Sequence, residues 1–338
     1  MRVMQRLLKQ ILTGLAIVLW LCETAGAQTD TVRVVYYPPW NISKLPMYLA
    51  RDMGIFDRNG LKIAWTDPGS NAKSVAALKK GEADIAVVSS NQAIVSMATG
   101  GGPMTFVGNT GYNYSVFLAA ASIKSAAELK GKKIGTSPPG ETPDQLTRVA
   151  LRRLGIDPEK DVTLVPFDEE RNTDRVNSLL TGQVSGMMVT ANTVYDLEKA
   201  GQIDRLNKLT DNRQLKIFAG GGADYAVATS FLKNRRDDVK KFMAGICEGI
   251  AVARKDKAKA LAFVAKSGRD LEPAKIEYLY KLYITEVIPA RPHLKIEGIE
   301  LGIQMAGLMT PSAGALKAQE LVDATLVPEL EKEGRCNF

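Results

Sequence analysis

Short apolar runs alternate along this chain with longer segments of helical periodicity. Each run is rich in β-branched or aromatic residues and ends at a proline, a glycine or a polar turn, which is typical of strands. Strands that alternate with helices predict mostly parallel sheets, because parallel neighbours need a crossover connection. The expected strands are residues 32–37, 61–66, 83–89, 104–109, 133–137, 162–167 and 186–190.

One pattern occurs twice, at residues 81–92 and again at residues 182–193. Each copy begins with a turn glycine, continues with an apolar run too short for a helix, and ends with hydroxyl and amide residues that open a helix. This order places a strand end beside a helix N-terminus, where open α/β sheets bind ligands. Two such units predict two similar lobes that share a cleft. From Phe231 onward the pattern is helical, and we expect these helices to cover the first lobe.

The first 27 residues have the features of an export signal. A positive start with Arg2 and Arg6 precedes an apolar stretch, residues 11–22, that is too short to span a bilayer. An A-x-A cleavage site follows, so we expect cleavage after Ala27 and a mature protein in the periplasm. The alternative is an uncleaved anchor helix. No later stretch is long and apolar enough to span a membrane.

Charge and composition exclude several functions. The formal net charge is +7, and the basic residues are scattered rather than gathered with aromatic residues in a stripe, so nucleic-acid binding is not expected. No spacing resembles a metal site, and His293 is the only histidine. Nucleophile-elbow and phosphate-loop motifs are absent from the sequence. We therefore expect a monomer without a cofactor, a metal or a catalytic site.

Two cysteines, Cys247 and Cys336, remain after signal cleavage. Cys247 borders an apolar helix stripe, which favours a buried free thiol. A bridge between the two cysteines is the alternative, and an exported protein permits it.

The segment from Ser137 to Gln145 is the sharpest local signal for a ligand site. Thr142 suits an N-cap, Pro143 suits the first helical position, and Gln145 completes a capping box. A capped helix start after a glycine-bearing loop offers free N–H groups to an anionic head group. The alternative is that Thr142 caps the helix and binds nothing.

Other candidate ligand residues follow strand ends in the two expected lobes. Trp40 follows the first strand, where an aromatic ring can stack on a flat ligand. Two acids, Glu141 and Asp224, lie near these loops and can meet an amine. Each residue has a structural alternative as a helix cap, hinge packing or ordinary surface. The full candidate set is Trp40, Ser89, Ser90, Asn109, Tyr112, Ser137, Gly140, Glu141, Thr142, Thr190, Asn192 and Asp224.

Four stretches together resemble solute-binding proteins of ABC importers, in the branch that binds nitrate, sulfonates, taurine and thiamine precursors. They are residues 44–56, 78–84, 129–135 and 180–184, and the resemblance covers nearly the whole mature chain. The sequence departs from the family at Ser185-Gly186, where Asp-Ala is common. That position supports the second lobe rather than the ligand.

The resemblance implies a type 2 periplasmic binding fold with two lobes and a two-strand hinge. The first lobe would comprise residues 28–118 and 225–338, and the second lobe residues 119–224. It also implies closure on a small-molecule ligand, an organic anion or zwitterion with a carboxylate or sulfonate, followed by docking on an ABC permease at the inner membrane.

Two other functions stay open. One is an enzyme resembling thiamine-pyrimidine synthases, which depend on a lysine and histidines in the cleft. The lack of a histidine before His293 and the export signal count against it. The other is a periplasmic sensor subunit that passes its ligand state to a receptor.

Overall fold

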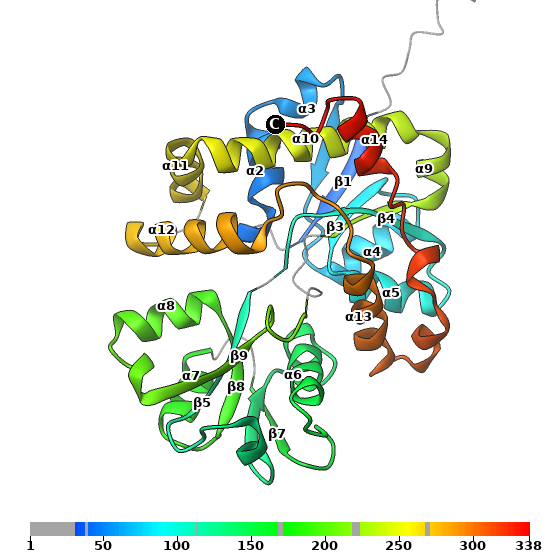
Figure 1. The fold of residues 1–338 in the computed structure, drawn as a ribbon. Helices are drawn as coiled ribbons and strands as arrows, with labels where there is room; N and C mark the ends of the chain where they lie inside the picture. The colour runs from blue at the N-terminus through cyan, green and yellow to red at the C-terminus, as the bar shows by residue number, and fades with distance from the viewer. Residues whose placement is uncertain (1–30, 38–39, 113, 168–171, 218–223, 268–270) are drawn as a thin grey trace, which may run out of the picture.

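The computed structural model describes residues 31–37, 40–112, 114–167, 172–217, 224–267 and 271–338, and they form two lobes (Figure 1). The expected export signal therefore lies outside the described residues. Each lobe contains one five-stranded sheet flanked by helices, which confirms the two-lobe α/β fold. The first sheet has the order β2-β1-β3-β10-β4, with β1 Val32–Tyr36, β2 Ile63–Thr66, β3 Ile85–Val88, β4 Met104–Asn109 and β10 Asp224–Ala228. The second has the order β7-β6-β8-β5-β9, with β5 Ser115–Ala120, β6 Lys133–Thr136, β7 Thr163–Pro166, β8 Gly186–Thr190 and β9 Leu206–Asp211.

Both sheets are mixed rather than wholly parallel. In the first, β1 pairs parallel with β2 and β3, while β10 runs antiparallel between β3 and β4. In the second, β6 pairs parallel with β7 and β8, while β5 runs antiparallel between β8 and β9. Each antiparallel strand is the first strand after the chain crosses from the other lobe: β5 follows β4, and β10 follows β9. It arrives directly from the hinge and needs no crossover helix.

The chain passes between the lobes after β4 and again after β9. The expected boundary at residue 118 falls inside β5, and both partners of β5 lie in the second sheet. We therefore propose that the lobes divide within residues 110–114 and within residues 212–223. Residues 113 and 218–223 of these connections lie outside the described part.

The two lobes repeat one another element by element. Helices α4 (Asn71–Lys79) and α5 (Ser90–Ala98) in the first lobe correspond to α7 (Asn172–Leu180) and α8 (Ala191–Lys199) in the second. The turn glycines at the start of the repeated pattern, Gly81 and Gly182, have φ values of 69° and 76°. Only glycine adopts this backbone conformation without strain, which explains why the turn residue is glycine in both copies.

From α9 (Thr229–Asn234) onward the chain is helical and covers the first lobe. Helix α10 (Arg236–Lys255) lies against α2 (Leu45–Asp52), and a Cβ on Gly249 would lie 2.1 Å from the carbonyl oxygen of Pro46. Glycine is therefore required for this close contact. The remaining helices are α3 (Ile55–Arg58), α6 (Thr142–Arg153), α9 (Thr229–Asn234), α11 (Lys257–Ser267), α12 (Pro273–Leu282), α13 (Ile296–Gly307) and α14 (Leu326–Lys332).

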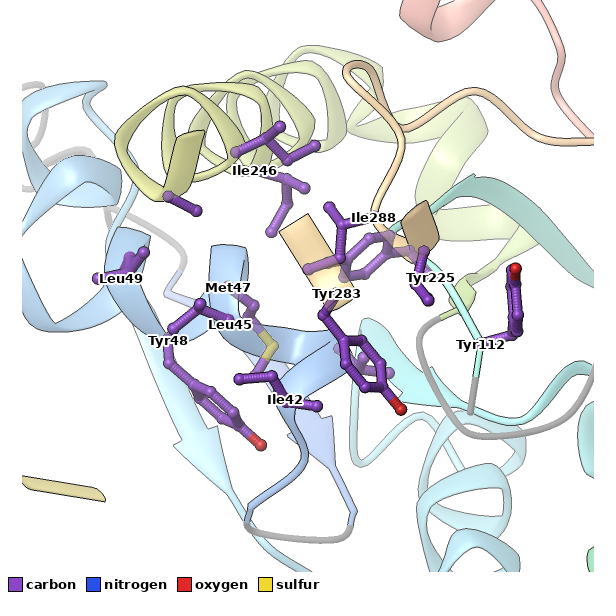
Figure 2. Packing of buried hydrophobic residues seen from close by; sticks show 14 of the residues in the cluster. Ile42, Leu45, Met47, Tyr48, Leu49, Tyr112, Tyr225, Ile246, Tyr283 and Ile288 are labelled. Atoms are coloured by element: carbon purple, nitrogen blue, oxygen red, sulfur yellow. The ribbon is translucent and has the colours of Figure 1, made fainter. Parts of the chain in front are cut away.

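The core of the first lobe contains a group of tyrosines that reaches toward the hinge. Figure 2 shows Tyr48 and Tyr283 packed among aliphatic side chains of α2 and its neighbours, with Tyr225 below Ile288 and Tyr112 to the side of this group. Trp65 is partly buried, and its ring centroid lies 5.5 Å from that of Phe56.

Cys247 and Cys336 form a disulfide, so the prediction of a free thiol is wrong. Helix α10 carries Cys247, and the turn after α14 returns the C-terminal segment to it, with 5.2 Å between the Cα atoms. The apolar stripe beside Cys247 was correctly identified as buried, but it could not show which segment covers it. None of the helices in the described part of the chain combines the length and apolar character needed to cross a bilayer.

Candidate functional site

Three of the candidate ligand residues, Asn109, Tyr112 and Asp224, line one pocket at the hinge end of the first lobe. Strand pairing brings them together, because β4 ends at Asn109, directly opposite the first residue of β10, Asp224. The pocket encloses about 40 Å³. Its other walls come from the segment before α13 and from the first turns of that helix: Val287, Pro289, His293, Leu294, Lys295, Gly298 and Ile299.

Asp224 is buried and already has protein partners on both carboxylate oxygens. Its Oδ1 accepts a hydrogen bond from Nδ2 of Asn109 at 2.6 Å, and its Oδ2 accepts one from the backbone N–H of Ser90 at 3.0 Å. Burial raises the pKa of Asp224 to about 6, although these hydrogen bonds oppose the shift. Asp224 therefore caps α5, and its carboxylate occupies the backbone N–H of Ser90, one of the candidate ligand residues.

The loop before α6 in the second lobe is also organised by a carboxylate. Helix α6 begins at Thr142, with Glu141 as N-cap, so the prediction that Thr142 caps the helix is wrong. The backbone N–H of Asp144 donates to Oγ of Ser137 at 2.9 Å, and Oδ2 of Asp144 accepts from the backbone N–H of Gly140 at 3.0 Å. The carboxylate of Asp144 thus accepts the N–H of Gly140, and the hydroxyl of Ser137, rather than that of Thr142, accepts a free N–H of the first turn.

The lobes meet through a buried amide pair. Nδ2 of Asn91, in the first turn of α5, donates to Oε1 of Gln145, in the first turn of α6, at 2.6 Å. The two residues are 0% and 2% exposed. Gly140 also lies at this boundary, because a Cβ at that position would be 3.3 Å from Cε of Met309. Asn91 and Gln145 lie in stretches that the sequence indicated, but neither is in the candidate set, since a long-range amide contact leaves no local signature.

The remaining candidates are more scattered. Trp40 stacks on Tyr48 with ring centroids 5.5 Å apart, so at least one side of its ring contacts the first lobe itself. Thr190 and Asn192 are exposed at the start of α8. Within the described ranges, no hydrogen bond joins either residue to the first lobe. Ser89 is buried at the end of β3.

Lys44 is a buried charged residue that was not selected as a site residue. It is fully buried before α2, and its Nζ donates to the carbonyl oxygen of Tyr37. Burial lowers the pKa of Lys44 to about 7. A lysine with this pKa could act as a nucleophile, but Lys44 lies within the core and outside the pocket lining.

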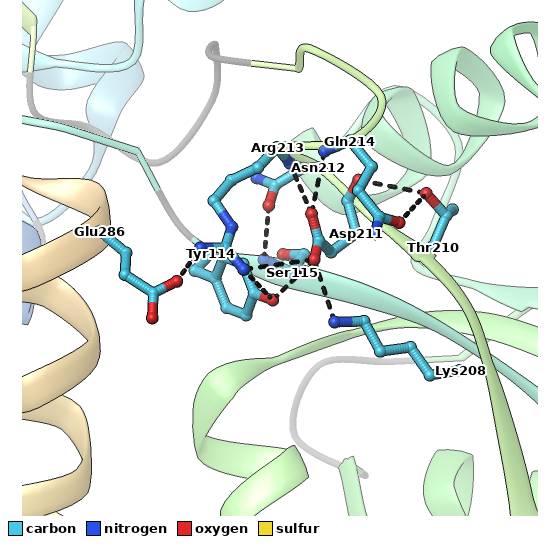
Figure 3. Close-up of polar contacts among 9 residues, drawn as sticks. All are labelled: Tyr114, Ser115, Lys208, Thr210, Asp211, Asn212, Arg213, Gln214 and Glu286. Atoms are coloured by element: carbon cyan, nitrogen blue, oxygen red, sulfur yellow. Dashed lines mark hydrogen bonds and ion pairs between the residues drawn. The ribbon is translucent and has the colours of Figure 1, made fainter.

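The two interlobe connections are joined by a network around Asp211 (Figure 3). Oδ2 of Asp211 accepts from Oη of Tyr114 and from Nζ of Lys208, each at 3.0 Å. Although burial favours the neutral acid, hydrogen bonds from the backbone of Gln214 and from these side chains lower the pKa of Asp211 to about 2. Arg213, beside Asp211, forms an ion pair with Glu286 of the first lobe. The network therefore bonds the two interlobe connections to each other and, through Glu286, to the first lobe.

A second set of contacts joins the lobes where α8 lies below α12 (Figure 1). We call the residues Tyr195, Asp196, Lys199, Glu272 and Lys275 the interlobe latch. Oη of Tyr195 donates to Oε1 of Glu272 at 2.5 Å, and Lys199 pairs with the same carboxylate. Lys275 pairs with Asp196 at 2.8 Å. Every contact in the latch links one lobe to the other.

Replacing Glu272 by Gln together with Lys275 by Met is expected to open the ligand-free protein. The substitutions remove the latch ion pairs and leave each lobe intact, so the ratio of closed to open molecules should fall several-fold. Distances between probes on the two lobes, measured by double electron–electron resonance, report this ratio. Glu277→Gln is the matched control, because Glu277 lies on the same helix and pairs with Lys257 of its own lobe. An unchanged distance distribution in the double variant would exclude the latch.

The comparisons with known proteins agree with this architecture. The model of the NMT1/THI5 like family matches residues 41–260, more than half of the chain. A Haemophilus influenzae protein named "Putative thiamine biosynthesis protein" is 33% identical over 143 residues, which are 41% of this chain and 43% of that protein. The chain thus spans less than half of the length of that curated relative.

Solved structures share the fold at low sequence identity. The periplasmic aliphatic sulphonate binding protein SsuA from Escherichia coli superposes with a TM-score of 0.63 at 20% identity, over 88% of this chain and 91% of that one. The periplasmic nitrate-binding protein NrtA from Synechocystis gives 0.62 at 12% identity, over 90% and 89%. These likenesses show the fold, and the family match adds the identity: this chain belongs to the NMT1/THI5-like family.

Proposed function

We propose that this protein is a periplasmic solute-binding protein. It captures a small organic anion or zwitterion, a carboxylate or sulfonate, between its lobes and delivers it to an ABC permease at the inner membrane. The observation that carries the proposal is the buried bond between Asn91 and Gln145, because it joins the helix starts of two matched lobes. A ligand that contacts both lobes favours the closed form by its difference in affinity for the two forms.

The pocket beside Asp224 supports a ligand with both signs of charge. Asp224 offers a carboxylate on one wall. Lys295 also lines the pocket, together with Gly298 and Ile299 of the first turns of α13, and Lys295, the N-cap of that helix, makes no side-chain capping hydrogen bond. Cations and helix N-termini stabilise anions. An amino group near Asp224 and an acid group near α13 would each meet an opposite charge.

Export is supported by the disulfide. Disulfides persist in oxidising compartments such as the periplasm, and this one joins two cysteines far apart in sequence. The proposal therefore includes the export signal at residues 1–27, a monomer in the periplasm, and the permease as partner. The periplasmic names of the solved relatives point the same way.

Binding without turnover is the favoured chemistry. Lys44 is buried in the core, and Nε2 of His293 lies 2.9 Å from a carboxylate oxygen of Glu331. Lys44 does not line the pocket, and the ring of His293, which does, is hydrogen-bonded to Glu331. We expect any identified ligand to be recovered unchanged after incubation with the protein, as judged by mass spectrometry. Conversion at catalytic stoichiometry would establish an enzyme instead.

A thermal-shift screen of carboxylates, sulfonates and their amino derivatives is expected to find stabilising compounds. A ligand at 100 times its dissociation constant adds about 2.7 kcal/mol to the free energy of unfolding, which raises the melting temperature measurably. Sugars, nucleotides and free metal ions serve as controls. Stabilisation by these controls alone would show that the proposed ligand class is wrong.

A further inference from the structure

The interlobe contact contains one polar atom that the described residues leave without a partner. Asn91 is fully buried, and its Nδ2 is used in the bond to Gln145. Its Oδ1 is equally buried, and no residue in the described ranges donates a hydrogen bond to it. Nearly all buried polar atoms in native proteins have a partner, because an unsatisfied acceptor has lost water without compensation.

The orientation of this amide follows from its neighbours. Nε2 of Gln145 donates to the carbonyl oxygen of Gly140 at 3.1 Å, so Oε1 of Gln145 is the atom that faces Asn91. An oxygen accepts only from a donor, which places Nδ2 of Asn91 toward Gln145 and its Oδ1 away. Exchanging the two atoms of Asn91 would bring two acceptors into contact.

The surroundings of Asn91 are rich in acceptors. The preceding residue, Ser90, already donates its backbone N–H to Oδ2 of Asp224, whose other oxygen accepts from Asn109. The first turn of α5 thus carries the amide oxygen of Asn91, and the residue before it is bonded to a buried carboxyl group. A group that completes this arrangement must donate hydrogen bonds, as an amino group does.

We propose that Asn91 determines specificity, and that its Oδ1 accepts a hydrogen bond from an amino group on the ligand. The ligand is then a zwitterion rather than a simple anion, a refinement that rests on the proposed function. Because Asn91 and Gln145 belong to different lobes, Gln145 orients Oδ1 of Asn91 for the amino group only after closure. Recognition of the amino group is therefore coupled to the closed form.

The test compares compounds that differ only in the amino group. Taurine is paired with ethanesulfonate, and β-alanine with propionate, and dissociation constants are measured by calorimetry on the exported protein. The amino compound of at least one pair is expected to bind at least about tenfold more tightly, since a site built for a hydrogen bond rejects an analogue that lacks it. Asn91→Leu, close in size to the native residue, should bring this ratio close to one.

Two further variants separate recognition from folding and from interlobe bonding. Asn91→Asp keeps an acceptor oxygen and loses the donor to Gln145, so the preference for the amino compound should persist. Gln145→Met removes the interlobe bond without changing Oδ1, so both members of a pair should weaken alike and their ratio should stay.

The outcomes are distinct. If the wild-type protein binds both members of each pair equally well, the amino group is not recognised and the proposed function still stands. If Asn91→Leu retains the full preference, or Asn91→Asp loses it, Oδ1 does not contact the ligand and a water molecule is its partner. If no member of either pair binds, the ligand class of the proposed function fails and this inference fails with it.

Discussion

Replacing both Cys247 and Cys336 with alanine is expected to lower the free energy of unfolding by about 2–5 kcal/mol. The disulfide closes a long loop, with a sequence separation of 89, and so restricts the unfolded chain far more than the folded one. It also ties α10, which packs on α2, to the C-terminal segment after α14. Urea unfolding of the wild-type protein and the double variant measures the difference.

The same comparison under reducing conditions provides the control. Reduction should bring the wild-type protein close to the double variant, because both then lack the cross-link. Thiols buried in an apolar environment behave as small hydrophobic groups, so alanine leaves only a small packing defect. Equal unfolding midpoints for the oxidised wild type and the double variant would show that the bridge contributes nothing to stability.

Most of the fold could be predicted from sequence because its determinants are local. The strands are short β-branched runs that end at turns, and β1, β3 and β8 lie within the expected ranges or coincide with them. The repeat could be detected because Gly81 and Gly182 both adopt positive φ, which requires glycine at the turn in both copies. The antiparallel strands β5 and β10 were harder to place, since their direction depends on the hinge and not on their own residues.

The candidate site could be predicted only in part. Asn109 was chosen because it follows a strand end, and Asp224 because an acid near these loops can meet an amine. Strand register brings the two together. The expected role of Thr142 was wrong because α6 already begins at Thr142, and the first-turn N–H of Asp144 is accepted by the hydroxyl of Ser137, while the carboxylate of Asp144 accepts the N–H of Gly140. No local rule indicates that an acid will be fully buried, since burial is decided by what packs over it.

Contacts between the lobes could not be predicted at all. Asn91 and Gln145 are separated by 54 residues, and Tyr195 and Glu272 by 77. Each of these residues has an ordinary helical environment in sequence. Their importance comes from the relative position of two lobes, which depends on the hinge network around Asp211. Site prediction in two-lobe proteins therefore requires the closed arrangement as well as the fold of each lobe.

Asp224→Asn is expected to abolish a large pH dependence of stability. Burial raises the pKa of Asp224 to about 6 in the folded protein, whereas an aspartate in an unfolded chain titrates near 3.9. The folded state thus binds the proton more tightly. The stabilisation from this proton is complete below about pH 4 and is lost as the pH rises to about 6. A shift of this size corresponds to about 3 kcal/mol.

Urea unfolding across this pH range tests the expectation. The stability of the wild-type protein relative to Asp224→Asn should fall by about 3 kcal/mol between about pH 4 and pH 7, because the amide carries no titrating proton. His293→Gln is the control, since His293 lines the same pocket. This variant keeps Asp224 and should therefore keep the fall in stability. Parallel profiles for the wild type and Asp224→Asn would show that the carboxyl group does not titrate there.

An amino ligand that pairs with the ionised carboxylate would release the same proton. Its affinity should therefore rise as the pH passes through about 6, and this pH dependence should be lost in Asp224→Asn.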